Sequence, residues 1–309
     1  MIFTLTLNPS LDRYLYVSQL IEDDTVRVSE IKDYPAGKGV DVSRVINELE
    51  GHSVSIMITG GENGSRLCRM LDEEGVVYAS VLIPEETRMN VIIQEPAKQY
   101  RLSMKGPEVP KIDIEKILKT IKTLIHENDY LILTGTPPSG VKTDIYRRIS
   151  DEICSEKNIT VYLDADKEAF KLGLQGKIKG IKPNSHELSR LIGRELNNEN
   201  EYIPAVKEVA ARYGLEEVLL TLGKDGAICF IKGEIFKVNI PKVPVKSAVG
   251  AGDSFLGAYC MYREKGENII NCLKMAAAAS SAAVMTEGTS LCEYKDVMNL
   301  KKEVSVVKL

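Results

Sequence analysis

The sequence contains no tryptophan and lacks several features that would assign a function at once. Its 309 residues carry 40 lysines and arginines against 44 aspartates and glutamates, a net charge of −4 with no long run of either sign. This balance argues against nucleic acid or a membrane surface as the main partner. No P-loop motif occurs, so the phosphates of a bound nucleotide would need another device to hold them.

Cysteine pairs of the CxxC type and long apolar runs are also missing. The six cysteines are scattered, which is typical of reduced thiols in a cytoplasmic protein. The start, MIFTLTLNP, lacks the basic residues and apolar core of a signal peptide and is predicted to be a strand. The segment MAAAASSAAVM, residues 275–285, is too short to span a bilayer, so we predict a closely packed helix there.

From about residue 110 the sequence alternates between amphipathic stretches and short apolar runs such as YLILTG and ITVYLDAD. This alternation predicts an α/β fold, a mostly parallel sheet with helices on both faces, in one domain covering residues 1–309. Ligands bind such sheets beyond the carboxyl ends of the strands. The residues after each apolar run are therefore the first candidates for a site.

The first third of the chain contains short alternating segments, RYLYVSQL, TVRVSEI, MNVIIQE and QYRLSMK, joined by polar turns. We interpret them as a small antiparallel flap inserted into the α/β body at about residues 12–34 and 88–105. Two glycine-opened stretches between them, GKGVDVSRVINELEG and NGSRLCRMLDEEG, have helical periodicity.

The stretch VGAGDSFLGAY, residues 249–259, places small residues before a predicted helix. Gly250, Ala251 and Gly252 would let a phosphate approach the free N–H groups of the helix start. Asp253 would then act as a general base beside this anion cradle. The alternative is a plain turn with Asp253 as the N-cap. A dinucleotide site is disfavoured because the third glycine of GxGxxG is missing.

Two further strand ends supply candidates for binding a nucleotide. In IKPNSHEL, Lys182 would meet phosphate oxygens, while Asn184 and Glu187 would face Mg²⁺ or its waters. The alternative, that Asn184 and Glu187 form a capping box, is compatible with this role. In LTLGKDG, Gly223 and Gly226 would let a nucleotide lie against the backbone, or would form an ordinary turn.

Taken together, these motifs resemble those of the PfkB carbohydrate kinases of the ribokinase superfamily. TLTLNPSLD, AGKGVDVSRV, LTGTPPSGV, KPNSHEL, TLGKDGA and VGAGDSFLGA follow the family's order and spacing over nearly the whole chain. NPSLD, the lysine of GKG and TPPSG are similar to the branch that phosphorylates fructose 1-phosphate, fructose 6-phosphate or tagatose 6-phosphate. The resemblance implies a ribokinase-like three-layer α/β/α fold with a small antiparallel β lid.

The resemblance also implies roles for individual residues. Asp253 would be the catalytic base, and Gly250, Ala251 and Gly252 the anion hole. The sugar hydroxyls would be bound at Asp12, Gly37, Gly39 and Asp41, and ATP with its Mg²⁺ at Lys182, Asn184, Glu187, Thr221, Gly223 and Gly226. K⁺ is a further candidate cofactor. The lid would close over the sugar and form the contact of a homodimer.

A phosphorylated sugar needs cations, and four basic residues lie in the glycine loop and flap: Lys38, Arg88, Arg101 and Arg27. Guanidinium and ammonium groups pair well with phosphate, so we predict that they hold it, Arg27 from the same or a partner lid. The alternative is that they are solvated surface charges. Lys38 and Arg88 in particular favour a sugar-phosphate kinase over a kinase of free sugars.

The chain departs from the family at a few positions. Asp41 stands where asparagine is usual, Ala248 where threonine is common, and Asp166 and Lys167 where a small polar residue and glycine occur. An ionised aspartate only accepts hydrogen bonds, which bears on the choice of sugar. Two alternative functions stay open: a kinase of an unphosphorylated sugar, and a regulator that binds a sugar phosphate without catalysis.

Overall fold

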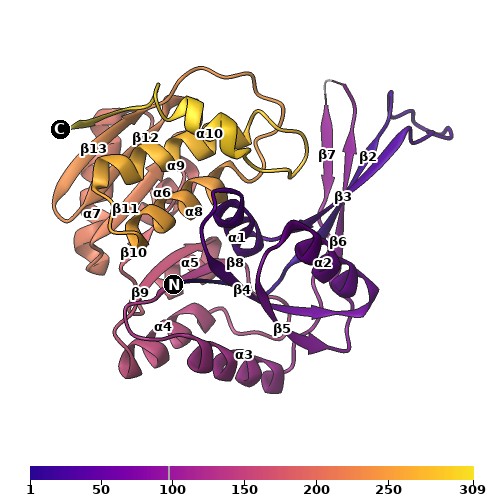
Figure 1. The fold of residues 1–309 in the computed structure, drawn as a ribbon, viewed down its shortest axis with the longest axis horizontal. Coiled ribbons are helices and arrows are strands. Elements are labelled where there is room, and N and C mark those ends of the chain that lie inside the picture. The colour runs from indigo at the N-terminus through magenta and orange to yellow at the C-terminus, as the bar shows by residue number, and fades with distance from the viewer. Residues whose placement is uncertain (97) are drawn as a thin grey trace.

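A ten-stranded sheet runs through the molecule, whose computed structural model describes residues 1–96 and 98–309 (Figure 1). The strands from β5 across to β11 run parallel, and β12 to β14 continue the sheet antiparallel. Across the sheet the order is β14 (Ser305–Lys308), β13 (Glu234–Asn239), β12 (Ala227–Ile231), β11 (Glu217–Thr221), β10 (Gly180–Ile181), β9 (Thr160–Ala165), β8 (Tyr130–Gly135), β1 (Ile2–Thr6), β4 (Ser53–Gly60) and β5 (Tyr78–Ile83).

The apolar runs of the sequence form the central strands of this sheet. YLILTG is β8, and its Leu131, Ile132 and Leu133 are fully buried. ITVYLDAD supplies β9 and ends at the same edge. Strands that are buried on both faces have continuous apolar sequences, which made these two recognisable. The prediction of strands at YLILTG and ITVYLDAD is confirmed.

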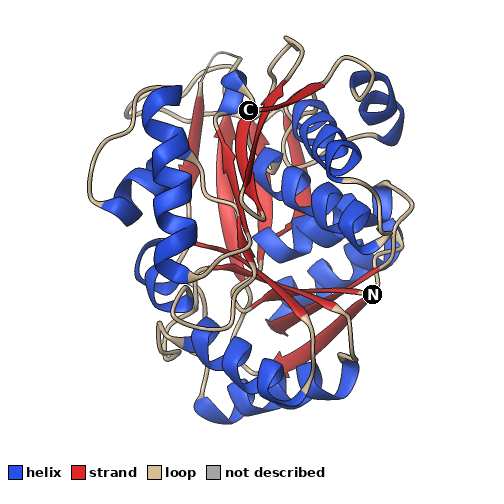
Figure 2. Ribbon diagram, turned by 90° about the vertical axis from the view of Figure 1, so that its left-hand side faces the viewer, coloured by secondary structure: helices blue, strands red, loops and turns tan. Residues whose placement is uncertain are grey.

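Helices cover both faces of the sheet, as Figure 2 shows. One face is covered by α3 (Lys111–Leu124), α4 (Ile145–Glu156), α5 (Lys167–Gly173), α6 (Ser185–Ile192) and α7 (Glu199–Tyr213). The other is covered by α1 (Lys38–Glu48), α8 (Ala251–Glu264), α9 (Ile269–Ala283) and α10 (Tyr294–Leu300), with α2 (Gly61–Glu74) in a smaller cluster beside α1. The predicted three-layer α/β/α arrangement is confirmed.

Helix α9 contains most of the alanine-rich segment of the sequence. Its small side chains, Ala276 to Ala279 among them, are buried where α9 packs against α8. Small residues permit this close approach of two helices. In the part of the chain that is described, no helix has both the length and the apolar character that a bilayer-spanning segment needs.

A separate four-stranded sheet, which we call the lid, projects beside the main body (Figure 1). Its order is β3 (Glu30–Ala36), β2 (Ser10–Tyr16), β6 (Arg88–Gln94) and β7 (Gln99–Leu102). The outer pairs are antiparallel as predicted, whereas β2 and β6 run parallel because they come from separate inserts.

The prediction of a strand at residues 25–31 was wrong for most of its length. All seven residues of β2 pair with residues 30–36, from Tyr16 opposite Glu30 to Ser10 opposite Ala36. This register leaves residues 17–29 as an exposed connection, although Val26 and Val28 alternate with polar residues as in a strand. Pro35 fits β3 because β3 is an edge strand of the lid.

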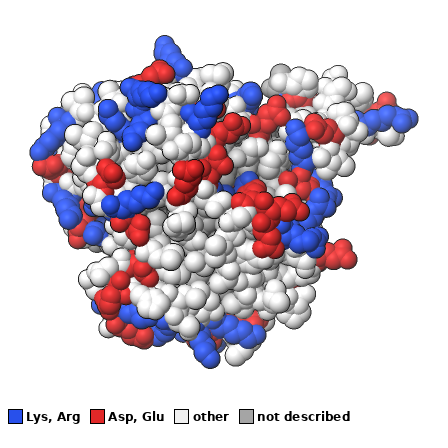
Figure 3. Space-filling view, viewed as in Figure 1, with Lys and Arg blue, Asp and Glu red and all other residues white. Residues whose placement is uncertain are grey.

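Charged side chains of both signs cover the face of the molecule shown in Figure 3. Lysines and arginines alternate with aspartates and glutamates around its rim, and the lower centre carries few charges. This distribution agrees with the near balance of 40 basic and 44 acidic residues.

Lys167, the first residue of α5, occupies the left-handed region with φ of 52°. A side chain costs about 1 kcal/mol or more in that region, and glycine avoids the cost. We therefore expect Lys167→Gly to raise the free energy of unfolding by about 1 kcal/mol in chemical denaturation. Lys171→Gly removes the same charge from a helical position of α5 and should lower it by about 1 kcal/mol. Equal effects would contradict the role of backbone strain.

Candidate active site

Helix α8 begins at Gly250, which is its N-cap and has left-handed φ and ψ of 74° and −4°. A Cβ atom there would lie 2.3 Å from Leu291 Cδ2, so both conformation and space require glycine. Asp253 is the third helical residue and caps nothing with its side chain, so the interpretation of Asp253 as an N-cap was wrong. The N–H groups of the first turn, including those of Ala251 and Gly252, have no carbonyl acceptor within the helix.

Two lysines and a buried aspartate lie against this helix start. Lys38 Nζ donates to Asp164 Oδ1 at 2.8 Å, and Lys182 Nζ lies 3.4 Å from Asp164 Oδ2. A Cβ at Gly252 would be 3.0 Å from Lys182 Nζ, which places that ammonium at the first turn of α8. Lys182 is 5% and Asp164 1% exposed, so both are shielded from bulk water, whereas the Lys38 side chain is 33% exposed.

Burial and neighbouring charges together set the pKa values of the groups in this cluster. Burial raises the pKa of Asp253 to about 6; Lys38 and Lys182 oppose the rise, while Asp164 and Glu187 add to it. Burial would also raise the pKa of Asp164, but Lys182 and Lys38 hold it below its ordinary value. Burial lowers the pKa of Lys38, yet Asp164 and Asp253 more than compensate, so Lys38 stays an ammonium. The site thus combines one carboxylate of raised pKa, Asp253, with the positive charge of the lysines.

Asn184 and Glu187 begin helix α6 beyond β10. Asn184 Oδ1 accepts from the Glu187 N–H at 2.9 Å, and Glu187 Oε2 accepts from the Asn184 N–H at 2.8 Å. The capping-box interpretation is therefore confirmed. Glu187 also acts on the pKa of Asp253 and of Lys38, so its carboxylate borders the charged cluster.

The predicted nucleotide residues of β11 and the following turn lie at the same edge of the sheet. The Thr221 N–H donates to Pro183 O at 3.0 Å, which joins β11 to the residue before Asn184. Gly223 has a φ of 58° with open space beside it. A Cβ at Gly226 would lie 2.0 Å from Val238 O, so the hairpin turn itself requires this glycine.

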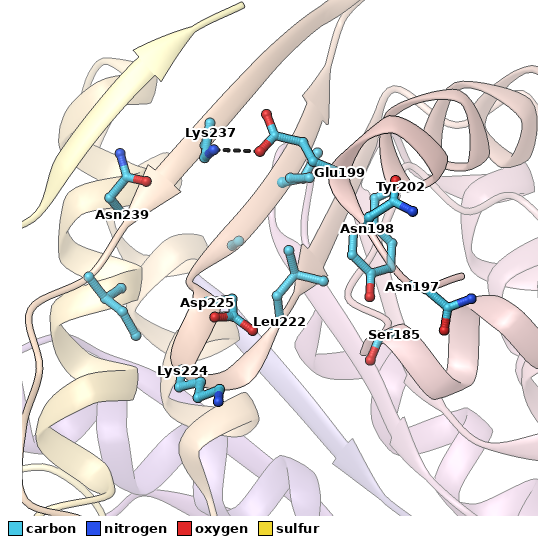
Figure 4. Close-up of a pocket in the computed structure, with 13 residues that line it drawn as sticks. Ser185, Asn197, Asn198, Glu199, Tyr202, Leu222, Lys224, Asp225, Lys237 and Asn239 are labelled. Atoms are coloured by element: carbon cyan, nitrogen blue, oxygen red, sulfur yellow. Dashed lines mark hydrogen bonds and ion pairs between the residues drawn. The ribbon is translucent and has the colours of Figure 1, made fainter. Parts of the chain in front are cut away.

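A cavity of about 540 Å³ adjoins this turn (Figure 4). Leu222, Lys224 and Asp225 form one side of it, and Lys237 pairs with Glu199 at another. Its lining is mostly polar, and it borders the nucleotide residues rather than Asp253. The cavity and the charged cluster are therefore separate features of one edge of the sheet.

Helix α1 begins with the GKG stretch and packs against the ends of β1 and β8. A Cβ at Gly39 would lie 2.5 Å from Thr6 Oγ1 and 2.8 Å from Thr134 Oγ1, so glycine is required for this approach. Gly37, the N-cap, has a φ of 132°. Any contact of these two residues with a ligand would therefore come from their backbone.

Asp41 is buried one turn into α1. Its Oδ1 lies 3.4 Å from Arg44 Nη1, and Glu74 and the Thr289 carbonyl hold the same guanidinium. Burial raises the pKa of Asp41 well above its ordinary value; Arg44 opposes the rise, while Asp253 and Asp12 add to it. The charges of Asp253 at the start of α8 and of Asp12 on the lid therefore both act on Asp41.

Asp12 lies on β2 of the lid, opposite Asn90 of β6. Its Oδ1 accepts from Ser10 Oγ and from Asn90 Nδ2, both at 2.8 Å, and Asn90 Oδ1 accepts from the Met104 N–H at 3.1 Å. Burial raises the pKa of Asp12, while these bonds and the charges of two arginines oppose the rise. Asn90 thus orients the carboxylate of Asp12.

Arg88 and Arg101 are the arginines that face Asp12. Arg88 Nη2 donates to Asn8 O at 3.1 Å, while its buried Nε has no hydrogen-bond partner among the described residues. Arg101 Nε donates to Gln99 Oε1 at 2.7 Å on the exposed strand β7. Arg27 is exposed in the 17–29 connection.

Lys38 and Arg88 contact different groups in the structure, and their joint binding of a sugar phosphate stays a prediction. Asp164 holds Lys38 within the charged cluster beside Asp253, whereas Arg88 acts on Asp12 at the lid. The deciding partner, Asp164, is 126 residues away in sequence. The rule that ligands bind beyond strand ends points to Asp164, which follows an apolar run, but no motif gave it a role, and Asn90 was not singled out.

Comparison with known proteins gives consistent matches over the whole chain. The profile described as pfkB family carbohydrate kinase matches residues 6–296. The chain is 30% identical to 1-phosphofructokinase of Bacillus subtilis (strain 168) over 309 residues, 100% of both chains. It is also 30% identical to ATP-dependent 6-phosphofructokinase isozyme 2 of Escherichia coli (strain K12), over 97% of each chain.

A solved structure shares the fold. Phosphofructokinase-2 from Escherichia coli in complex with potassium superimposes with a TM-score of 0.92 at 30% identity, covering 98% of each chain. The large, mostly parallel sheet and the separate small sheet are therefore those of this group of structures, which confirms the predicted fold.

Proposed function

The chain belongs to the pfkB family of carbohydrate kinases, and from that premise we propose that it transfers the γ-phosphoryl group of ATP to a ketohexose monophosphate, giving a bisphosphate. The observation that carries the proposal is the pairing of two charged regions. Asp253 with two lysines lies at the start of α8, and Asp12 with two arginines lies on the strands of the lid. The charges of Asp253 and of Asp12 both act on Asp41.

Asp253 acts as the general base in this proposal. Its carboxylate takes the proton from the sugar hydroxyl as that oxygen bonds to the γ-phosphorus, and the bond from phosphorus to the β-phosphate oxygen breaks. The N–H groups at the start of α8, at Gly250, Ala251 and Gly252, receive the negative charge of the phosphoryl oxygens. The half-buried position of Asp253 supports a base that is protected from water but reachable by substrate.

Lys38 and Lys182 stabilise the transferring phosphoryl group. Both ammonium groups are held by Asp164 next to α8, so they are in place before substrate arrives. For Lys38 this role is proposed beside the predicted contact with the acceptor phosphate.

Asn184 and Glu187 lie on the nucleotide side, with Thr221, Gly223 and Gly226. Their oxygens suit a hard cation through its waters, and Mg²⁺ held there would neutralise charge on the phosphates of ATP. The capping box fixes both side chains. It uses Glu187 Oε2, so Oε1 of the same carboxylate takes no part in it. K⁺ is the proposed monovalent cofactor, supported by the potassium complex of the related structure.

The sugar phosphate lies under the lid in this proposal. Asp12 and the backbone of Gly37 and Gly39 receive its hydroxyls, and Arg88 and Arg101 bind its phosphate. The buried, unpartnered Nε of Arg88 supports this, because an anion would satisfy it. Asp41 stands where the family has asparagine, and burial raises the pKa of its carboxyl while Arg44 opposes the rise.

We further propose a single kinase domain over residues 1–309 that acts in the cytoplasm as a homodimer through the lid. The lid exposes large apolar side chains on its outer strands, Ile31 at 59% and Leu102 at 49%. A second lid would cover them, and Arg27 in the 17–29 connection would then reach the partner's sugar phosphate.

An ADP-release assay tests the proposed activity. The purified chain would be offered Mg·ATP with fructose 1-phosphate, fructose 6-phosphate, tagatose 6-phosphate or free fructose. Saturable turnover of one hexose phosphate, well above free fructose, supports the proposal. Preferred turnover of free fructose would favour the free-sugar kinase, and binding of sugar phosphates without turnover would favour a non-catalytic regulator.

Glu187→Gln should raise the free Mg²⁺ concentration for half-maximal rate by about tenfold, as loss of a residue that orients metal-bound water usually does. Glutamine preserves the capping box, so α6 should keep its start. The measurement is rate against free Mg²⁺ at saturating sugar phosphate. Glu195→Gln, at an exposed residue of the loop after α6, is the matched control. A shift confined to the KM of the sugar would contradict the metal-side placement.

The pH profile should report the raised pKa of Asp253. With a pKa of about 6, the base is protonated and inactive below that pH, and it becomes competent as the pH rises through it. Because this pKa belongs to the ligand-free chain, we expect log(kcat/KM) to rise with pH, bend near pH 6 and level off above about pH 7. A kcat/KM that stays constant down to about pH 5 would contradict a base with this pKa.

A further inference from the structure

The connection between α9 and α10 touches the lid at three places within residues 286–291. Tyr14 of β2 and Thr289 share a hydrogen bond between hydroxyls at 3.3 Å. A Cβ at Gly288 would lie 2.7 Å from the Tyr34 ring of β3, and Lys32 of β3 pairs with Glu287 at 3.5 Å. The edge strand β3 and its neighbour β2 therefore both contact the 286–291 segment.

The same segment touches the start of α8. Leu291 has a φ of 63° and is 3% exposed, and its Cδ2 occupies the space that a Cβ at Gly250 would need. The hydroxyl of Thr286 donates to the Leu291 carbonyl at 2.6 Å, which closes the segment into a compact loop. Movement of this loop would therefore reach the N-cap of α8.

A third contact leads toward Asp41. The Thr289 carbonyl accepts from Arg44 Nη1 at 2.8 Å, and the same nitrogen lies 3.4 Å from Asp41 Oδ1. Thr289 is fully buried, so one residue joins the lid hydroxyl of Tyr14 to the guanidinium beside Asp41.

We propose that the 286–291 segment couples the lid to the anion-binding start of α8, so that a sugar phosphate under the lid tightens the binding of ATP. The inference rests on the proposed function, because it assigns the sugar to the lid and the triphosphate to α8. For such coupling, the contact between the lid and the segment must be able to break while the rest of the segment stays packed on the body. Lys32 and Glu287 are 37% and 56% exposed and can separate, whereas Thr289 and Leu291 are buried and move with the body.

Coupling of this kind is measurable as a ratio of affinities. The affinity for a non-hydrolysable ATP analogue with Mg²⁺ would be measured by calorimetry, with and without the hexose phosphate that the chain phosphorylates. Positive coupling between two sites is typically about 5- to 150-fold, and the same factor must appear for the sugar when the analogue is present. We expect the unaltered chain to show a factor in this range.

Two matched pairs of variants locate the coupling. Gly288→Ala and Gly266→Ala both place a side chain at positive φ, but only the first contacts the lid, at Tyr34. Leu291→Ala and Leu300→Ala both truncate a buried leucine, but only the first contacts Gly250. We expect Gly288→Ala and Leu291→Ala to reduce the factor to less than about twofold and the two controls to keep it.

The outcomes separate this inference from the proposed function. If both ligands bind but independently in the unaltered chain, or if all four variants keep the same factor, the coupling role is wrong and the kinase proposal stands. If neither hexose phosphates nor the ATP analogue bind, the proposed function fails and the coupling fails with it. Equal loss in the variants and their controls would show general destabilisation and would also overturn the role of the segment.

Discussion

Asp253→Asn should lower kcat by about 10²- to 10⁴-fold, the usual contribution of a positioned general base. Asparagine keeps the shape of the side chain and removes its basicity. Because burial raises the pKa of Asp253, the fold already disfavours its charge, and the amide should not destabilise it. The measurement is ADP release at saturating substrates, together with thermal unfolding.

The control for this variant is Asp296→Asn, which removes an acidic residue from the first turn of α10. Like Asp253→Asn, it removes one negative charge from the first turn of a helix, but this helix lies outside the charged cluster. Turnover of Asp296→Asn should match that of the unaltered chain. Near-normal turnover of Asp253→Asn would remove Asp253 from the role of base, whatever the affinity for ATP.

The body of the fold could be predicted because its signals are local. The continuous apolar run YLILTG can be satisfied only by a strand covered on both faces, and β8 has the bounds of that run. The TVRVSEI prediction fails for a non-local reason. Its alternation of apolar and polar residues is typical of a strand. However, β2 pairs with residues 30–36, and this register cannot be predicted from the local sequence.

The site could be predicted where a motif contains its own geometry. The small residues of GAGD predict a helix start, and α8 does begin there with Gly250 at positive φ, while anion binding at this start stays a prediction. Lys38 differs, because a lysine between two glycines can turn toward either end of the site. Asp164 decides the direction, and only the pairing of β8 with β9 brings it there.

The observed position of Lys38 predicts a division of labour between two cations. Lys38→Met should lower kcat by about 10²- to 10³-fold and leave the KM of the sugar phosphate nearly unchanged, since the ammonium stabilises charge that develops during transfer. Arg88→Ala should raise that KM by about ten- to a hundredfold with a smaller effect on kcat, since each 1.4 kcal/mol is a factor of ten. Full saturation curves for both substrates measure the split.

A double variant separates the chemistry of Lys38 from its structural role. Lys38→Met alone leaves Asp164 buried with Lys182 as its remaining partner, so the thermal midpoint should fall. Adding Asp164→Asn then leaves the buried Lys182 without its ion-pair partner, so the midpoint should fall further, while turnover stays low because the Lys38 ammonium is still absent. Recovery of turnover together with stability would show that Lys38 acts only by neutralising Asp164. A raised sugar-phosphate KM in Lys38→Met with unchanged kcat would instead place Lys38 beside Arg88 on the acceptor phosphate, against its contact with Asp164.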